Sequence, residues 1–287
     1  MTVNEIYQSG LKLLENNNIE NSKFEAQSLL QAFSLDRVGF IIHKTDKADE
    51  NCSQNFLNFI EKRISGEPLQ YILGEWSFMG FDFKVGRGVL IPRDDTEVVV
   101  NLCIDFLKNR TDKKTVDLCS GSGAIAVALD KISGAEVTAV EIDETAFSYL
   151  ETNVKENNSS VKPVMADALK ICETFADGGL DLIVSNPPYI KSADVETLQK
   201  EVQLEPRLAL DGGEDGCDFY REIVSRWSRK LKKGGALAFE LGENQADAVK
   251  ALMTEQGFSD FKISLDFGGV QRAICLLYTS PSPRDMR

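Results

Sequence analysis

Strands and helices alternate along the chain from residue 115 onward, and this alternation constrains the fold more than any other feature of the sequence. The apolar pattern predicts strands over residues 115–118, 136–140, 162–165, 180–185, 236–241 and 261–265. Helices are predicted over residues 124–131, 144–157, 219–231 and 245–255. Such alternation is typical of a mostly parallel α/β sheet with helices on both faces. In these sheets, ligands bind at the carboxyl ends of the strands.

The first part of the chain has a different pattern. Residues 1–65 show the apolar spacing of helices, and Ser22-Lys23-Phe24-Glu25 matches a capping box that would open a helix through Phe33. From Trp76 the pattern changes to alternation, with a turn at Met79-Gly80, which predicts a β-hairpin. A further helix is predicted from Thr96 to about residue 108. We therefore expect a helical bundle and a hairpin linker before the α/β sheet.

Charge and residue usage exclude several classes of function. The chain has 32 basic and 45 acidic residues, a net charge of -13, which counts against nucleic acid as the main partner. With His43 as its single histidine, it lacks multi-histidine metal sites, and its six cysteines form no CxxC pair. We expect no metal. Scattered cysteines in an acidic chain without a signal peptide suit a reducing cytoplasm. The sequence contains no run of eighteen apolar residues, the length that would suggest a membrane span.

A loop of small residues follows the predicted strand at residues 115–118. Small residues let the backbone approach a ligand closely, and the helix that follows begins with free N–H groups. Glu141 ends the next strand, where a carboxylate can accept both hydrogen bonds of a ribose diol. The pattern fits S-adenosylmethionine, a dinucleotide, or a tight turn with no ligand. Asp117, just before the loop, favours S-adenosylmethionine, whose sulfonium and ammonium groups are positive. The loop residues are Cys119, Ser120, Gly121, Ser122 and Gly123.

A second motif, Asn186-Pro187-Pro188-Tyr189, follows the predicted buried strand at residues 180–185. The two prolines fix φ and lack N–H groups, so the turn is stiff and its carbonyls are free to accept hydrogen bonds. Asn186 precedes proline and is held extended. Its side-chain oxygen and the Pro187 carbonyl can therefore grip one planar NH₂ group, with Tyr189 as an aromatic wall. This arrangement suits methylation of a planar amino or amide nitrogen through positioning and electrostatics. The alternative is a proline-rich turn without chemistry.

With these motifs, the chain resembles the peptide chain release factor glutamine methyltransferases, the PrmC/HemK family, over about residues 1–274. The resemblance rests on the Asn186 motif together with three further segments, at residues 66–74 (GEPLQYILG), 89–97 (VLIPRDDTE) and 205–216 (EPRLALDGGEDG). It implies S-adenosylmethionine-dependent methylation of the glutamine side-chain amide in the Gly-Gly-Gln loop of bacterial class I release factors. The implied fold is a Rossmann-like methyltransferase sheet with an N-terminal helical bundle and a β-hairpin linker.

By position, the resemblance also assigns roles to individual residues. The loop Cys119 to Gly123 would hold the methionine end of S-adenosylmethionine, Glu141 the ribose, and Asp167 and Ala168 the adenine. Asn186 would contact cofactor and substrate, and residues 186–189 would bind the glutamine. Two positions depart from the family pattern, because Cys119 stands where many relatives have glycine and Glu141 where many have aspartate.

Other motif residues are open to two interpretations. Arg93 and Glu97 either pair with each other and brace the active-site edge or form a plain surface salt bridge. Residues 205–216 are expected to form an ordered loop over the cleft, which either contacts the partner or is purely structural.

The expected domains are a helical substrate-recognition domain over residues 1–72, the hairpin linker over 73–94 and the methyltransferase domain over 95–274. Residues 275–287 are expected to be a non-native or disordered tail, because residues 275–285 back-translate to a common transposase adaptor and residues 278–283 would break a strand. The terminal strand would then end near Ile274.

Two alternatives to this function remain. An adenine-N(6) DNA methyltransferase needs the same grip on a planar NH₂, but it must also flip a base and hold phosphates. A module that binds release factor without methylating it is the second. We expect a cytoplasmic monomer that acts on release factors and has no direct nucleic-acid or membrane partner.

Overall fold

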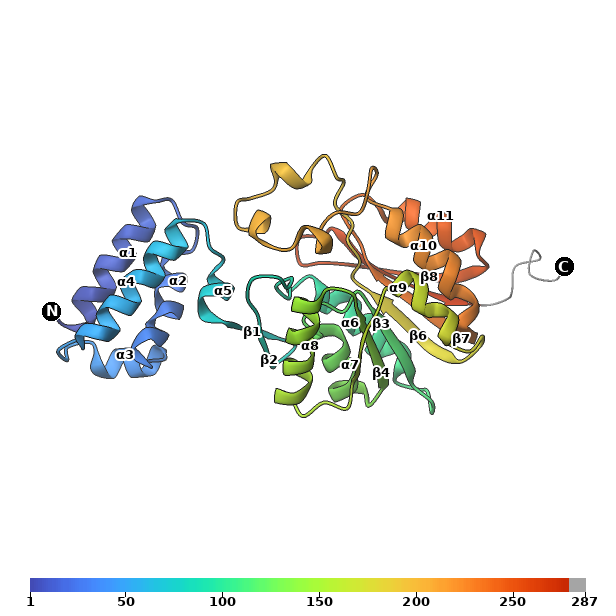
Figure 1. The fold of residues 1–287 in the computed structure, drawn as a ribbon, viewed down its shortest axis with the longest axis horizontal. Helices are drawn as coiled ribbons and strands as arrows, with labels where there is room; N and C mark the ends of the chain where they lie inside the picture. The colour runs from blue at the N-terminus through green and yellow to red at the C-terminus, as the bar shows by residue number, and fades with distance from the viewer. Residues whose placement is uncertain (279–287) are drawn as a thin grey trace. The chain divides into compact units, whose positions relative to one another are not determined.

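The structure is a computed structural model that describes residues 1–278, and it divides into two compact units that we describe separately. The first unit comprises Met1–Glu75 together with Gln199–Leu204. It is helical, as the sequence predicts for its N-terminal part. Its α-helices are α1 (Val3–Asn16), α2 (Ser22–Ser28), α3 (Arg37–His43), α4 (Glu50–Ile64) and α5 (Leu69–Leu73), with 3₁₀ turns at Leu29–Phe33 and Val202–Leu204 (Figure 1).

One capping prediction in this unit is wrong. Ser22 is the first residue of α2, and its hydroxyl donates to the carbonyl of Ile19, so it does not cap the helix. The capping box instead opens α1. There the Thr2 hydroxyl accepts from the Glu5 N–H, and the Glu5 carboxylate accepts from the Thr2 N–H. The second helix also ends at Ser28, and the predicted remainder to Phe33 is a 3₁₀ turn.

The second unit, Trp76–Leu198 with residues from Glu205 onward, contains a seven-stranded sheet in the order β5-β4-β3-β6-β7-β9-β8. The five strands β3 to β7 run parallel to one another, and β9 is antiparallel to β7 and β8. This confirms the predicted mostly parallel α/β fold. The strands are β3 (Lys114–Leu118), β4 (Glu136–Glu141), β5 (Lys162–Met165), β6 (Leu180–Ser185), β7 (Leu231–Glu240), β8 (Phe258–Leu265) and β9 (Gln271–Tyr278).

Helices cover both faces of this sheet (Figure 1). On one face, α6 (Thr96–Leu107), α7 (Ala124–Ser133) and α8 (Glu144–Glu156) bury apolar residues such as Val99, Val127 and Leu150. On the other face, α9 (Ala168–Ile171), α10 (Asp218–Trp227) and α11 (Ala246–Glu255) build a second core around Trp227 and Phe239. Short 3₁₀ turns lie at Cys172–Thr174, Val195–Thr197, Arg207–Ala209 and Ser228–Lys230.

The predicted hairpin is present as β1 (Glu75–Phe78) and β2 (Phe81–Lys84). Met79 and Gly80 both have positive φ, at 52° and 82°, as the tight turns that join hairpin strands require. On the sheet unit, the Met79 N–H donates to the Glu97 carboxylate, and the Lys84 N–H donates to the Asn153 side chain. These contacts tie the hairpin to α6 and α8.

The expected end of the terminal strand near Ile274 is wrong. Strand β9 continues to Tyr278, because Cys275, Leu276 and Leu277 pair with Ala238, Leu237 and Ala236 on β7. The side chains of Cys275 and Leu276 are buried in the core, and that of Leu277 packs against it. The rest of the predicted tail, residues 279–287, lies outside the described residues. Within residues 1–278, no helix has both the length and the apolar composition needed to cross a membrane.

Candidate functional site

The two sequence motifs meet where the strand order of the sheet reverses. The chain runs from β3 outward to β4 and β5, then returns to place β6 on the other side of β3. Leu118 and Ser185, the last residues of β3 and β6, are register partners. The Cys119 loop and the Asn186 motif therefore leave the sheet side by side, at the position where ligands bind in open α/β sheets.

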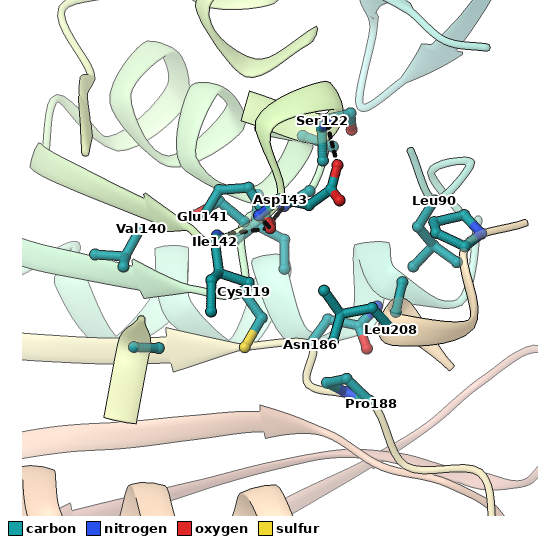
Figure 2. Close-up of a pocket in the computed structure, with 18 of the residues that line it drawn as sticks. Leu90, Cys119, Ser122, Val140, Glu141, Ile142, Asp143, Asn186, Pro188 and Leu208 are labelled. Atoms are coloured by element: carbon teal, nitrogen blue, oxygen red, sulfur yellow. Dashed lines mark hydrogen bonds between the residues drawn. The ribbon is translucent and has the colours of Figure 1, made fainter. Parts of the chain in front are cut away.

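A cavity of about 260 Å³ opens at this point. It is lined by seven predicted cofactor residues, which are Cys119, Ser120, Gly121, Ser122, Glu141, Asp167 and Ala168, and by Asn186 and Pro188 of the second motif. Figure 2 shows Cys119 and Asn186 facing the same space, with Pro188 and Leu208 beside the asparagine. The structure thus brings together residues that are separated by almost seventy positions in the sequence.

The loop after β3 has the backbone of a glycine-rich turn although it begins with a cysteine. Cys119 has a φ of 58°, and Gly121 and Gly123 have φ of 53° and 83°. Left-handed conformations cost little for glycine and more for other residues. A Cβ at Gly123 would lie 2.5 Å from the Leu150 side chain, so the helix α8 packs directly on this turn. This left-handed cysteine lines the cavity, and backbone strain of this kind clusters at functional sites.

Glu141 ends β4 and organises the loop beside it. One carboxylate oxygen accepts from the Gly121 N–H at 2.8 Å, and the other accepts from the N–H groups of Ile142 and Asp143 at 2.8 and 2.9 Å (Figure 2). The longer arm of glutamate therefore folds back onto the backbone. The oxygen bonded to the Gly121 N–H can accept a further hydrogen bond, because each carboxylate oxygen has about two acceptor sites and the other oxygen uses both.

Asp117 lies behind the loop, outside the set of described residues that line the cavity. It is fully buried, and burial raises the pKa of its carboxyl to about 8, with the negative charge of Glu141 adding to the effect. Gly123, Pro187 and Tyr189 are likewise outside the lining formed by residues 1–278.

Asn186 and Tyr189 both face polar partners next to the cavity. The Asn186 side-chain nitrogen donates to the Thr96 hydroxyl at 3.4 Å, and the Tyr189 hydroxyl donates to the Glu240 carboxylate at 3.2 Å. Tyr189 is therefore turned toward Glu240 at the end of β7. Thr96 and Glu240 are not among the site residues predicted from the sequence. The signal that could have found Glu240 is an acid at the carboxyl end of a buried strand.

The predicted pairing of Arg93 with Glu97 is wrong. The Arg93 guanidinium pairs with the buried carboxylate of Glu205, which also accepts from the Ile91 N–H at 3.1 Å. Glu97 instead accepts from Met79 in the hairpin turn. Arg93 reaches Glu205 because residues 205–216 lie along this edge of the sheet unit, where Pro206, Leu208 and Ala209 line the cavity.

Comparisons with known proteins agree with this architecture. Residues 93–256 match the model of the methyltransferase small domain, and residues 5–74 match the PrmC N-terminal domain. The release factor glutamine methyltransferase of Geobacter sulfurreducens is 40% identical over 89% of both chains. That of Clostridium acetobutylicum is 32% identical over 96% of this chain and 98% of its own.

Solved structures share the fold at lower identity. A methyltransferase from Pyrococcus furiosus superposes with a TM-score of 0.53 at 20% identity, over 81% of this chain and 100% of that one. Both release factor glutamine methyltransferases are more than 30% identical to this chain over at least 89% of their own length. The chain therefore belongs to the release factor glutamine methyltransferase family.

Proposed function

We infer that this chain methylates the side-chain amide nitrogen of the glutamine in the Gly-Gly-Gln loop of bacterial class I release factors, with S-adenosylmethionine as the methyl donor. The observation that carries this proposal is the position of Asn186. It leaves the sheet beside the glycine-rich loop and shares one cavity with it. A methyl donor in the loop and an amide held by Asn186 would therefore meet.

The cavity suits a ligand that is positively charged and carries a ribose. Glu141, Asp143 and Asp167 contribute carboxylates to its lining, whereas Arg93 contributes a basic side chain. A dinucleotide would bring its negative pyrophosphate among these three acids, which disfavours that alternative. The apolar side chains of Ile142 and Leu169 can cover the faces of an adenine. We therefore assign the loop and Glu141 to the methionine and ribose, and Asp167 and Ala168 to the base.

The cofactor supplies a methyl group on a positively charged sulfur, and the protein prepares the nitrogen that accepts it. An amide nitrogen is a weak nucleophile because its lone pair is delocalised. With its nitrogen bound to Thr96, the Asn186 amide has its oxygen free to accept from the substrate NH₂ group. The Pro187 carbonyl is the second acceptor in this proposal. Two acceptors orient the nitrogen and stabilise positive charge as it develops there.

The remaining assignments follow from this chemistry. We assign release-factor recognition to the helical unit, with a domain border near residue 72 and the hairpin at residues 73–94 as the linker. We propose that the protein acts as a cytoplasmic monomer without direct nucleic-acid contact. The excess of 45 acidic over 32 basic residues supports a protein substrate over DNA.

Intact-mass measurement of a release factor tests the proposal. The purified protein is incubated with release factor and S-adenosylmethionine, and the product is mapped by peptide fragmentation. We expect a gain of one methyl group on the loop glutamine. The matched control is Asn186→Ala, which should lower kcat by about 100-fold or more with little change in cofactor affinity, because it removes an acceptor at the reacting nitrogen. Methyl transfer to DNA alone, or full turnover by the variant, would contradict the proposal.

A further inference from the structure

A buried chain of hydrogen bonds leads from Asn186 through Thr96 to Glu240. The Asn186 side-chain nitrogen donates to Thr96 Oγ1 at 3.4 Å, and Thr96 Oγ1 donates to Glu240 Oε2 at 2.6 Å. Thr96 is 4% exposed and Glu240 is 1% exposed. Thr96 also lines the cavity, whereas Glu240 lies behind it. Glu240 can therefore influence the reaction only through its neighbours.

The chemistry of the three groups fixes the direction of these hydrogen bonds. When Glu240 is ionised, its carboxylate accepts hydrogen bonds and donates none, so the Thr96 hydroxyl must give its hydrogen to Glu240. The hydroxyl oxygen is then left to accept. Of the two ends of the Asn186 amide, only the NH₂ can donate to it. The amide oxygen must consequently point the other way, toward the cavity.

The surrounding residues hold Glu240 in place. Its other carboxylate oxygen accepts from the Tyr189 hydroxyl, and its backbone carbonyl accepts from the Tyr220 hydroxyl at 2.9 Å. The charged groups that face it are Arg272 on β9 and Asp95 before α6, which pair with each other at 3.3 Å. Groups from several parts of the sheet unit thus surround Glu240, and the Thr96 and Tyr189 hydroxyls bond its carboxylate directly.

We propose that Glu240 is a positioning residue, which acts through the Thr96 hydroxyl to hold the Asn186 amide with its oxygen toward the substrate nitrogen. This inference rests on the proposed function. The orientation matters because a flipped amide would present NH₂ to NH₂, two donors facing each other. We call the hydrogen-bonded chain from Glu240 through Thr96 to Asn186 the relay. Without the relay, the Asn186 side chain loses its preference for the productive orientation.

Substitutions at Thr96 and Glu240 separate this role from simple packing. Thr96→Val keeps the shape and removes the hydroxyl, and we expect kcat to fall by about 10- to 100-fold, as for misplaced catalytic groups. Thr96→Ser restores the hydroxyl and should recover most of kcat. Cofactor affinity should be unchanged in both. Thr115→Val is the matched control, because Thr115 is equally buried at the far end of β3 and its hydroxyl meets the Lys113 carbonyl.

A double-mutant cycle tests the coupling. Glu240→Gln should lower kcat when Thr96 is present and have little further effect in the Thr96→Val background, because the relay is already broken. Independent losses in the two single variants would overturn the proposal, as would wild-type kcat in a folded Thr96→Val variant. Both variants are checked for folding by circular dichroism and cofactor binding.

The wild-type pH profile provides a second kinetic readout. Burial raises the pKa of Glu240 to about 7. Because the relay needs the ionised carboxylate, kcat should rise with pH through that region in the wild type and lose this step in Thr96→Val. An identical step in both would contradict the relay.

A measurement without turnover distinguishes this inference from the proposed function. In protein labelled at asparagine, the side-chain NH₂ resonances of Asn186 should shift as Glu240 ionises, and this shift should vanish in Thr96→Val. Absence of methylation by the wild type would refute the proposed function alone. If the Asn186 side-chain NH₂ resonances changed neither with pH nor on substitution of Thr96, the relay alone would be refuted.

Discussion

Burial controls the chemistry of Asp117. Its carboxyl lies inside the sheet unit, and neither side-chain oxygen has a hydrogen-bond partner within residues 1–278. The resulting rise in its pKa to about 8 leaves the side chain mostly neutral at pH 7. The carboxylates that line the cavity directly are those of Glu141, Asp143 and Asp167. We therefore expect Asp117 to affect stability in a pH-dependent way.

Replacing Asp117 by asparagine tests this expectation. An unfolded aspartate ionises near pH 3.9, so between about pH 4 and pH 8 the folded protein retains a proton that the unfolded chain releases. The wild-type free energy of unfolding should therefore fall as pH rises, by up to about 1.4 kcal/mol per pH unit from this group. Asp117→Asn has no such proton, so its stability relative to the wild type should increase from pH 5 to pH 8.

Urea unfolding of the cofactor-free protein at several pH values measures this difference. Asp247→Asn, which changes an exposed carboxyl on α11, controls for the substitution itself. Parallel pH curves for the wild type and Asp117→Asn would show that Asp117 is already ionised in the folded protein.

At the scale of elements, the segment at residues 205–216 braces the Asn186 motif. The Ile190 N–H donates to the Leu210 carbonyl at 2.9 Å, and the Gly212 N–H donates back to the Ile190 carbonyl at 2.8 Å. From α11, the Gln245 side chain donates to the Tyr189 carbonyl at 2.9 Å. The sequence left partner contact and a structural role open for this segment. These contacts give it a structural role next to the site.

The Gly212→Ala variant should disturb this brace. A Cβ at Gly212 would lie 2.7 Å from the Pro188 carbonyl oxygen and from the Tyr189 Cα, and backbone atoms cannot move aside as a flexible side chain can. We expect a loss of about 1–3 kcal/mol in stability from overpacking and a fall in kcat of about 10- to 100-fold from displacement of the motif.

Gly268→Ala is the matched control, since Gly268 is exposed in the turn before β9 and its nearest neighbour is the end of the Asp266 side chain at 3.2 Å. Thermal unfolding and initial rates are compared for the two variants. Equal initial rates in the two variants would show that the contacts of residues 205–216 do not affect the reaction.

Local patterns explain which elements could be predicted from the sequence. The strands at residues 162–165 and 180–185 match the structure because apolar runs bounded by turn residues define them. The cavity lining around Cys119 and Asn186 was likewise predictable, since both motifs follow strands. The Thr96–Glu240 bond was not, because its partners are 144 residues apart and meet only through the position of β7 in the sheet. The end of strand β9 was misplaced because its sequence runs into an unusual C-terminal segment.

At the scale of the whole molecule, the chain leaves the sheet unit and returns to it within a few residues. Residues Gln199–Leu204 belong with the N-terminal helices, whereas the residues on both sides belong with the sheet. Arg63 on α4 holds this segment. It is 4% exposed and bonds the buried Glu25 carboxylate at 2.5 and 3.1 Å and Glu201 at 2.5 Å. No sequence pattern indicates this pairing, because Arg63 and Glu201 are 138 residues apart.

Replacing Arg63 by methionine should destabilise the helical unit. Methionine has a similar length but leaves the carboxylate of Glu25 buried without its cation, a defect that costs about 3–5 kcal/mol. Hydrogen exchange followed by mass spectrometry should therefore show loss of protection in α2, α4 and residues 199–204.

Arg226→Met is the control, because Arg226 forms an exposed pair with Glu222 on α10, and such pairs contribute about 0–1 kcal/mol. Cofactor affinity should persist in both variants, since the residues that line the cavity belong to the sheet unit. Unchanged protection of residues 199–204 in Arg63→Met would show that this segment does not depend on the arginine.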